Sequence, residues 1–277
     1  MKDLFVLSLQ ALRCCSFEKK RQHIENLEVL INSGNFSSTR LTPALPVLEP
    51  GRPSLPIHVH PSEVKRRRLG SVEGRVALIH AIAHIEFNAI NLALDAIYRF
   101  ADMPDEYYQD WIRVAREESS HFQLLCERLH DLSSSYGALT AHGGMWLMAV
   151  ETDYDVMVRM ALVPRVLEAR GLDVTPVMLA KLKKVKDEKT VEVFERILRE
   201  EVEHVKIGNR WFNALCDQRG LSSQATFKKL LYKHGRAALR GPFNRPARLA
   251  AGFSAQELAE LDQIEQLFRK ESSSEIA

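Results

Sequence analysis

The chain has 277 residues, of which 45% are hydrophobic and 27% charged, and its formal net charge at pH 7 is +2. This is the composition of an ordinary soluble globular protein, and so small a net charge says little about partners. No apolar run has an evident membrane-spanning length, and basic residues follow the N-terminus too closely for a signal peptide. The four cysteines show no metal-ligand spacing, and we expect reduced thiols and a cytoplasmic location. We also expect no membrane association.

The first part of the chain, residues 1–62, predicts a helical and proline-rich segment. Residues 1–31 suggest one or two helices, whereas six prolines between Asn32 and Ser62 exclude long regular structure. We expect the proline-rich stretch to wrap the protein, with a domain linker as the alternative. The cluster Arg66-Arg67-Arg68 is a candidate nucleic-acid or phosphate contact, although a solvated approach to the next helix is the favoured interpretation.

Residues 63–220 predict a four-helix bundle. Apolar residues recur at helical spacing, Ser71 is a plausible N-cap, and Pro164 is expected to bend the third helix before Gly171 ends it. A short extra segment should follow from Thr175-Pro176 to about Lys186. Residues 133–146 are expected to form the long crossover that a ferritin-like bundle needs, serving partly as a lid. The four helices are expected at 71–101, 105–132, 147–170 and 187–218.

The last part of the chain, residues 221–277, predicts a helical extension packed on the bundle. One helix is expected at 222–234. A closing helix should begin at Ser254, because Ser254 and Glu257 have the spacing of a capping box. The tail after Lys270 is expected to fray. The prediction is therefore an all-α protein, a ferritin-like four-helix bundle with extensions at both ends.

A sequence pattern that occurs twice indicates the chemistry. Residues 113–121 and 196–204 both read Arg-x-x-Arg-Glu-Glu-x-x-His, and a further glutamate precedes the second glutamate of each copy by 32 or 33 residues. Residues three apart on a helix project from one face, so the glutamate and the histidine of each Glu-x-x-His can reach one metal pair together. This is the ligand set of a dinuclear carboxylate site in a four-helix bundle. The candidate ligands are Glu86, Glu118, His121, Glu168, Glu201 and His204.

Oxygen-rich ligands with some nitrogen suit iron, the expected metal, or manganese. We expect Glu118 and Glu201 to bridge two ions, Glu86 and His121 to complete one, and the remaining pair to complete the other. The glutamates interrupt apolar stripes, where an unpaired carboxylate is costly. One alternative is that the Glu-x-x-His spacing arose by chance and that these residues form solvated pairs. Another is a bundle that keeps these residues but binds no metal. The neighbouring charges expected at the surface are Glu117, Glu200 and Glu203, with Arg113, Arg116, Arg196 and Arg199 as possible partners.

From about Ser71 to Asn244 the sequence resembles the bacterial ferritin-like family known as domain of unknown function 455. The resemblance lies in the stretches 84–86, 161–171 and 204–212, which include Glu86, Glu168 and His204. It implies the fold and the metal site but no settled reaction. More distantly the chain is similar to the di-iron hydroxylases that oxidise a modified adenosine in tRNA, by shared bundle and ligand pattern alone.

These observations leave three functions open. The first is an oxygen-activating di-iron oxidase or hydroxylase of unknown substrate, which would need an external electron donor because the chain lacks a Cys-x-x-Cys site and a dinucleotide-binding glycine loop. The second is a metal-storage or peroxide-scavenging protein of the ferritin type. The third is a nucleic-acid-binding or scaffolding protein, which merges with the first if the substrate is tRNA.

Overall fold

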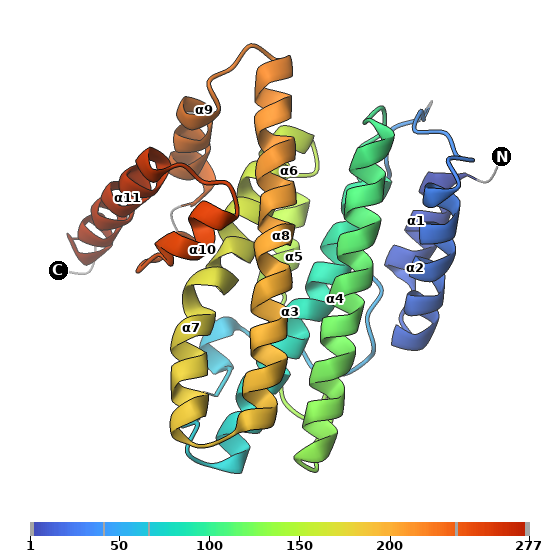
Figure 1. Ribbon diagram of the computed structural model, residues 1–277. Helices are drawn as coiled ribbons and strands as arrows, with labels where there is room; N and C mark the ends of the chain where they lie inside the picture. Colours follow the sequence, from blue (N-terminus) through green and yellow to red (C-terminus); the bar gives the residue numbers. More distant parts are fainter. Residues whose placement is uncertain (1–2, 41, 66, 236–237, 275–277) are drawn as a thin grey trace. The chain divides into compact units, whose positions relative to one another are not determined.

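The computed structural model describes residues 3–40, 42–65, 67–235 and 238–274 (Figure 1). Regular structure in these residues is helical, apart from an isolated bridge between His58 and Ala141, so the predicted all-α class is confirmed. The chain divides into two compact units. Unit 1 comprises Met1–Asp153 and Lys184–Val193, and unit 2 comprises Tyr154–Lys183 and Phe194–Ala277. The predicted segment boundaries after residues 62 and 220, and the ferritin-like arrangement, stay predictions.

Unit 1 is built around a pair of long helices, α3 and α4. In Figure 1 the helices α1 and α2 lie beside α4, and contacts also join α1 to α3. Side-chain caps explain where helices begin: the Asp3 carboxylate accepts from the backbone N–H of Phe5 at 2.9 Å, and the Ser71 hydroxyl accepts from that of Gly74 at 3.1 Å. The helices are α1 (Leu4–Arg13), α2 (Phe17–Asn32), the 3₁₀ turn η1 (Pro61–Glu63), α3 (Val72–Arg99), α4 (Asp105–Asp131), α5 (Gly144–Glu151) and the start of α8 (Glu188–Gln218).

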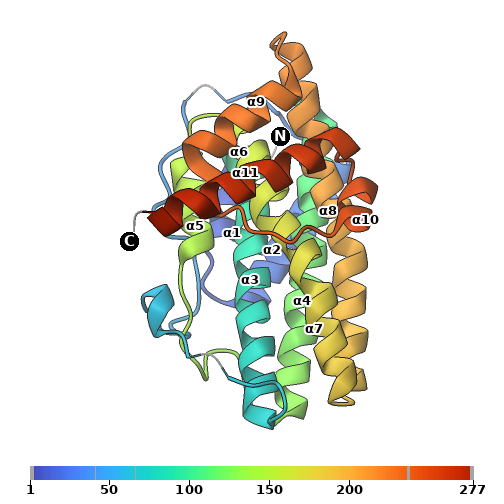
Figure 2. The same cartoon turned by 90° about the vertical axis from the view of Figure 1, so that its left-hand side faces the viewer.

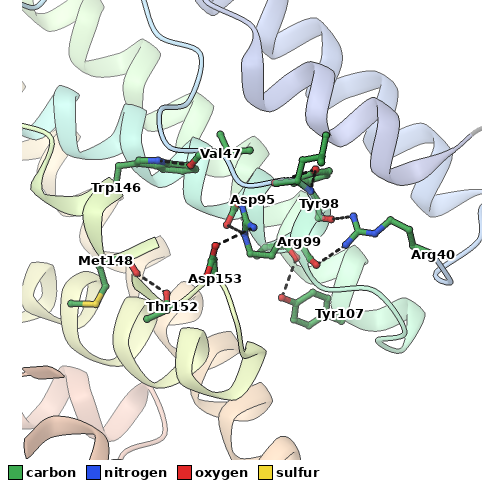
Figure 3. A network of polar contacts seen from close by, with 12 residues as sticks. Arg40, Val47, Asp95, Tyr98, Arg99, Tyr107, Trp146, Met148, Thr152 and Asp153 are labelled. Carbon is green, nitrogen blue, oxygen red and sulfur yellow. Dashed lines mark hydrogen bonds and ion pairs between the residues drawn. The ribbon is translucent and has the colours of Figure 1, made fainter. Parts of the chain in front are cut away.

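The proline-rich segment before α3 lies against unit 1 rather than leading away from it (Figure 3). The Arg40 guanidinium donates to the carbonyls of Tyr98 and Arg99, at 2.7 and 2.9 Å, at the end of α3. These carbonyls have no partner within the helix, so the arginine both satisfies them and complements the helix dipole. Further along, the indole N–H of Trp146 donates to the carbonyl of Val47. The segment therefore packs on α3 and α5.

Unit 2 contains a proline-bearing π-helix and the C-terminal helices. Figure 2 shows α9 and α11 side by side, joined by a hydrogen bond of 2.7 Å from Gln224 to Glu260. The capping box is confirmed, because Ser254 and Glu257 each accept a hydrogen bond from the backbone N–H of the other. The helices are α6 (Val156–Leu162), the π-helix η2 (Val163–Glu168), α7 (Ala169–Lys184), the rest of α8, α9 (Ser223–Leu230), the π-helix η3 (Leu231–Gly235), α10 (Arg245–Ala250) and α11 (Ala255–Ser274).

The helix predicted over 147–170 is wrong in its limits. The chain breaks after α5, and Asp155 starts α6 by accepting from the backbone N–H of Met157 at 2.7 Å. Gly171 does not end the helix, which continues as α7 through Pro176 to Lys184. A proline removes the hydrogen bond to the carbonyl four residues earlier. That carbonyl, of Leu172, accepts instead from the side-chain amide of Asn244 at 2.9 Å, a partner distant in the chain.

The helix α3 corrects the sequence-based view that no run is long enough to cross a membrane. Over 28 residues it reaches a mean hydropathy of 1.4 in its most apolar window, and 67% of that window is buried. A core helix of a soluble protein gives the same signal. We interpret α3 as a core helix, since it carries buried polar residues that bond to other parts of unit 1.

Candidate metal centre

The first half of the candidate centre lies between α3 and α4 in unit 1. Glu86 on α3 and Glu118 and His121 on α4 are exposed by 5%, 1% and 0%. The Nδ1 atom of His121 lies 3.1 Å from Oε2 of Glu86 and 3.4 Å from Oε2 of Glu118. One potential ligand atom from each of the three residues lies within 4.8 Å of the others, so they can bind a single ion. Sequence reasoning predicted this grouping.

Local structure explains the convergence. Glu118 and His121 are one turn apart on α4 and share its buried face with Ala115 and Phe122. Glu86 stands on the facing helix, and α3 and α4 have the most extensive packing of any helix pair in the unit. Apolar neighbours on α4 are buried with the three polar side chains, which leaves those side chains little exposure to solvent.

The electrostatics of this half-site suit a cation. Burial, and then the nearby Glu118 carboxylate, raise the pKa of Glu86 to about 8, while the hydrogen bond from His121 opposes the rise. Keeping both groups ionised in so dry a place requires a positive partner, either a metal ion or a protonated His121. Oxygen ligands with one imidazole match iron or manganese. The donor set and its burial therefore fit a metal ion.

The second half lies in unit 2. His204 on α8 is fully buried, and its Nδ1 atom is 3.3 Å from Oε1 of Glu201, whose side chain is 12% exposed. The pair repeats the one-turn spacing of Glu118 and His121. Glu168, 7% exposed, is the last residue of η2. All six predicted residues are thus on helices and buried or nearly so, three in each unit.

The π-helix that carries Glu168 results from Pro164. Proline cannot donate the usual helical hydrogen bond, and here the backbone widens so that the N–H of Ala169 bonds to the carbonyl of Pro164, five residues earlier. Such short π-segments are frequent at functional sites. The prediction of a distortion before Glu168 is confirmed, with the distortion being a π-helix rather than a simple bend.

Gly208 lets η2 approach α8. Gly208 lies one turn beyond His204 on α8. A Cβ atom at this position would overlap the ring of Pro164. We expect Gly208→Ala to lower the free energy of unfolding by about 1–3 kcal/mol, because a rigid ring must move. Urea unfolding would measure this. Gly171→Ala is the matched control, since nothing lies within 4 Å of its added Cβ, and it should stabilise the helix slightly. Equal effects of the two substitutions would contradict the close approach.

The charges expected at the surface of the repeat behave largely as predicted. Glu203 is exposed and lies 3.2 Å from Lys206, and Arg196 lies 3.1 Å from Glu200. Arg116 lies 3.0 Å from Glu28 on α2, a partner that the repeat itself did not reveal. These ion pairs are exposed or half-buried, and such pairs contribute little to stability.

The basic cluster is only partly described. Arg66 lies outside the described residues, whereas Arg67 and Arg68 are exposed. His142, in the loop that precedes α5, is also exposed. Sequence reasoning missed the polar groups behind it: Nδ1 of His84 lies 2.8 Å from the hydroxyl of Tyr136. The signal was present, because His80 and His84 are one turn apart on α3.

Comparison with known proteins agrees with the resemblance noted from the sequence. The family model described as "Protein of unknown function (DUF455)" matches residues 13–259. A protein of Haemophilus influenzae (strain Rd), described as "Uncharacterized protein", is 47% identical over 224 residues, which cover 78% of this chain and 78% of that protein. No solved structure is significantly similar to the chain. The matched region contains all six candidate ligands, and the chain belongs to the DUF455 family.

Proposed function

We propose that the two half-sites together bind two metal ions, most of all iron. The protein would then be an oxygen-activating oxidase or hydroxylase, located in the cytoplasm. The observation that carries the proposal is the buried cluster of Glu86, Glu118 and His121. A second buried Glu-x-x-His pair, Glu201 and His204, has the same spacing and pairing. A single structural ion would not require this duplication.

The ligand assignment follows the sequence repeat. Glu118 and Glu201 would bridge the ions, Glu86 and His121 would complete one, and Glu168 and His204 the other. The four carboxylates balance the charge of two divalent cations, and the imidazoles add neutral nitrogen ligands. Six protein ligands leave coordination positions for solvent or dioxygen. Manganese at one or both positions is compatible with the same donors.

The protein's own residues would supply orientation and a dry environment. Bound iron would provide the electrons and the reactivity toward oxygen. Around it, Phe122 and Val205, which are 3% and 0% exposed, exclude water beside the two histidines. Because Glu168 is the last residue of the π-helix η2, its carboxylate is the ligand with the least regular helical support, and we propose that it changes position during the reaction.

Oxygen reactivity tests the enzyme proposal. Iron-loaded protein, reduced without air and then mixed with oxygenated buffer, should show an optical change that develops and decays in a single turnover. The Glu201→Ala protein, treated identically, should show none. A reduced, fully loaded protein that stays unchanged in oxygen would contradict the oxidase or hydroxylase. Electrons for repeated turnover would come from an external donor.

The tRNA-modifying alternative has one specific observation in its favour, the exposure of Arg67 and Arg68 beside the start of α3. Clustered arginines bind phosphate groups through charge and hydrogen bonds. Replacing both with glutamate should weaken tRNA binding in a filter assay if the substrate is tRNA. For a storage protein, in contrast, a sizing column should show a very large assembly.

A further inference from the structure

A pocket that is partly open to solvent lies in unit 1, apart from the candidate metal ligands. It is a cavity of about 170 Å³ between α3, α5 and the proline-rich segment. Phe87 and Trp146, exposed by 1% and 5%, contribute aromatic walls, and Leu147 and Val150 add apolar surface. Asn88 and Asn91 of α3 line it as well. The cavity is thus mainly apolar with a few buried polar groups, as ligand-binding pockets are.

The cavity and Glu86 lie on different sides of α3. At about 100° per residue, His84, Asn88 and Asn91 are displaced from Glu86 by roughly 140–200° around the helix axis. Glu86 faces His121 of α4, whereas the three other residues line the cavity. The cavity is consequently a different site from the one proposed to bind metal.

Asn91, which lines the cavity, carries a buried hydrogen-bond donor without a partner among the described residues. The side chain is fully buried, and its oxygen lies 2.8 Å from the ammonium of Lys20, which also bonds to the carbonyls of Ala11 and Leu12. A protonated lysine can only donate, so the amide oxygen must face it and the amide nitrogen must face away. Within the described residues, Nδ2 of Asn91 has no hydrogen-bond partner. A buried donor without a partner is costly, which indicates a missing acceptor.

Asn88, one turn earlier on the same face, presents the opposite group. Its Nδ2 donates to the carbonyl of His84 at 2.7 Å, so this nitrogen is fixed beside the helix backbone. The amide oxygen is then the atom available as an acceptor. The Nε2 atom of His58, also at the cavity, has no partner among the described residues. The protein thus offers a donor and an acceptor on neighbouring turns. They match a ligand that carries an acceptor and a donor attached to the same carbon, as an amide does.

We propose that this cavity binds a small, neutral, planar molecule with an amide edge, such as an aromatic carboxamide or a cyclic amide. A dry protein cavity of about 150 Å³ holds one benzene molecule, so a single ring with an amide fits the size. The amide oxygen would accept from Asn91 and the amide N–H would donate to Asn88, with the ring against Phe87 and Trp146. Net charge argues against an anion, because Glu49 lines the cavity together with Arg52.

Three ring compounds of nearly equal size separate the possibilities. Benzamide, benzoate and toluene would be titrated into the full-length protein at pH 6 by calorimetry or ligand-observed NMR. At pH 6 Lys20 is protonated, since burial lowers the pKa of its ammonium only to about 7. Benzamide should bind at least tenfold more tightly than the other two. Equal or tighter binding of benzoate would mean an anion site, and equal binding of toluene would mean a purely apolar cavity; each result would overturn the proposal.

Isosteric substitution tests the role of Asn91. Asn91→Asp keeps an oxygen toward Lys20 but turns the donor at the cavity into an acceptor, so benzamide affinity should fall at least tenfold. Asn35→Asp makes the same change at an exposed position and should have no effect. If Asn91→Asp does not fold, Leu147→Trp, at an exposed residue that lines the pocket, should weaken binding by adding bulk to the lining. Unchanged benzamide binding in these variants, or no binding to the wild-type protein, would overturn the proposal.

A further comparison separates this inference from the proposed metal function. Glu118→Ala, whose position faces Glu86 on the other side of α3, should bind benzamide with wild-type affinity. If this variant lost metal and kept benzamide, the two sites would be independent. Loss of benzamide binding in a folded Glu118→Ala protein would contradict the separation of the cavity from the metal ligands.

Discussion

Replacing Glu118 or Glu201 with alanine is expected to reduce the metal content from two ions per chain to nearly none. Each is assigned as a bridging ligand, so its loss removes a donor from both ions at once. Glu203→Ala is the matched control, because Glu203 is exposed and two residues from Glu201 on the same helix. Elemental analysis of the three purified variants measures the effect. Full metal content in the folded Glu118→Ala protein would exclude this residue as a ligand.

Substitution of Glu118 should stabilise the protein once its metal has been removed. Near pH 8, where Glu86 loses its proton beside Glu118, the two buried carboxylates repel one another, so Glu118→Gln should there stabilise the metal-free protein, by on the order of 1 kcal/mol. Urea unfolding in the presence of a chelator would measure the difference. A residue kept for stability would instead give a less stable protein on substitution, with or without metal.

The stability of the metal-free protein should fall as pH rises from about 6 to 8. The pKa of Glu86 is raised from 4.5 to about 8 in the folded state, so between these values the folded protein holds a proton that the unfolded chain has released. Stability is then greatest below pH 4.5, as far as this group decides it, and declines through the window up to about 8. The expected loss between pH 6 and 8 is on the order of 2 kcal/mol.

Bound metal should reverse this dependence. A metal ion displaces the proton from Glu86, so metal affinity should increase over the same pH range, and the loaded protein should keep its stability at pH 8. Urea unfolding at both pH values, with metal and with chelator, gives the four required numbers. Glu86→Gln should lose the pH dependence in the chelated protein. An unchanged dependence in that variant would assign it to another group.

The long helices and half of the candidate site could be read from the sequence. Periodic apolar residues specified α3, α4 and α8 to within a few residues, and the Ser71 cap marked the start of α3, because such signals are local to each helix. The Glu118 and His121 pairing likewise follows from their spacing on one helix. Periodicity could not show where a helix is interrupted or where it continues. The predicted third helix was accordingly wrong in its limits.

Two features required contacts between distant parts of the chain. The continuation of α7 through Gly171 and Pro176 depends on Asn244, some seventy residues later in the chain. Its side-chain amide donates the hydrogen bond to the carbonyl of Leu172 that Pro176 cannot donate. Asn91 reads in the sequence as a polar interruption of an apolar helix. Its role becomes apparent only with Lys20, from another helix, fixing the amide. No local pattern carries information of this kind.

Metal content of the wild-type protein tests the central claim most directly. The protein would be produced in iron-replete medium, purified without chelator and analysed for iron and manganese, with an optical spectrum before and after reduction and exposure to air. We expect about two ions per chain, chiefly iron, with a spectrum that responds to oxygen. Folded protein that contains no metal and takes up none on incubation with ferrous iron would contradict it, and would leave a protonated His121 as the partner of the buried carboxylates.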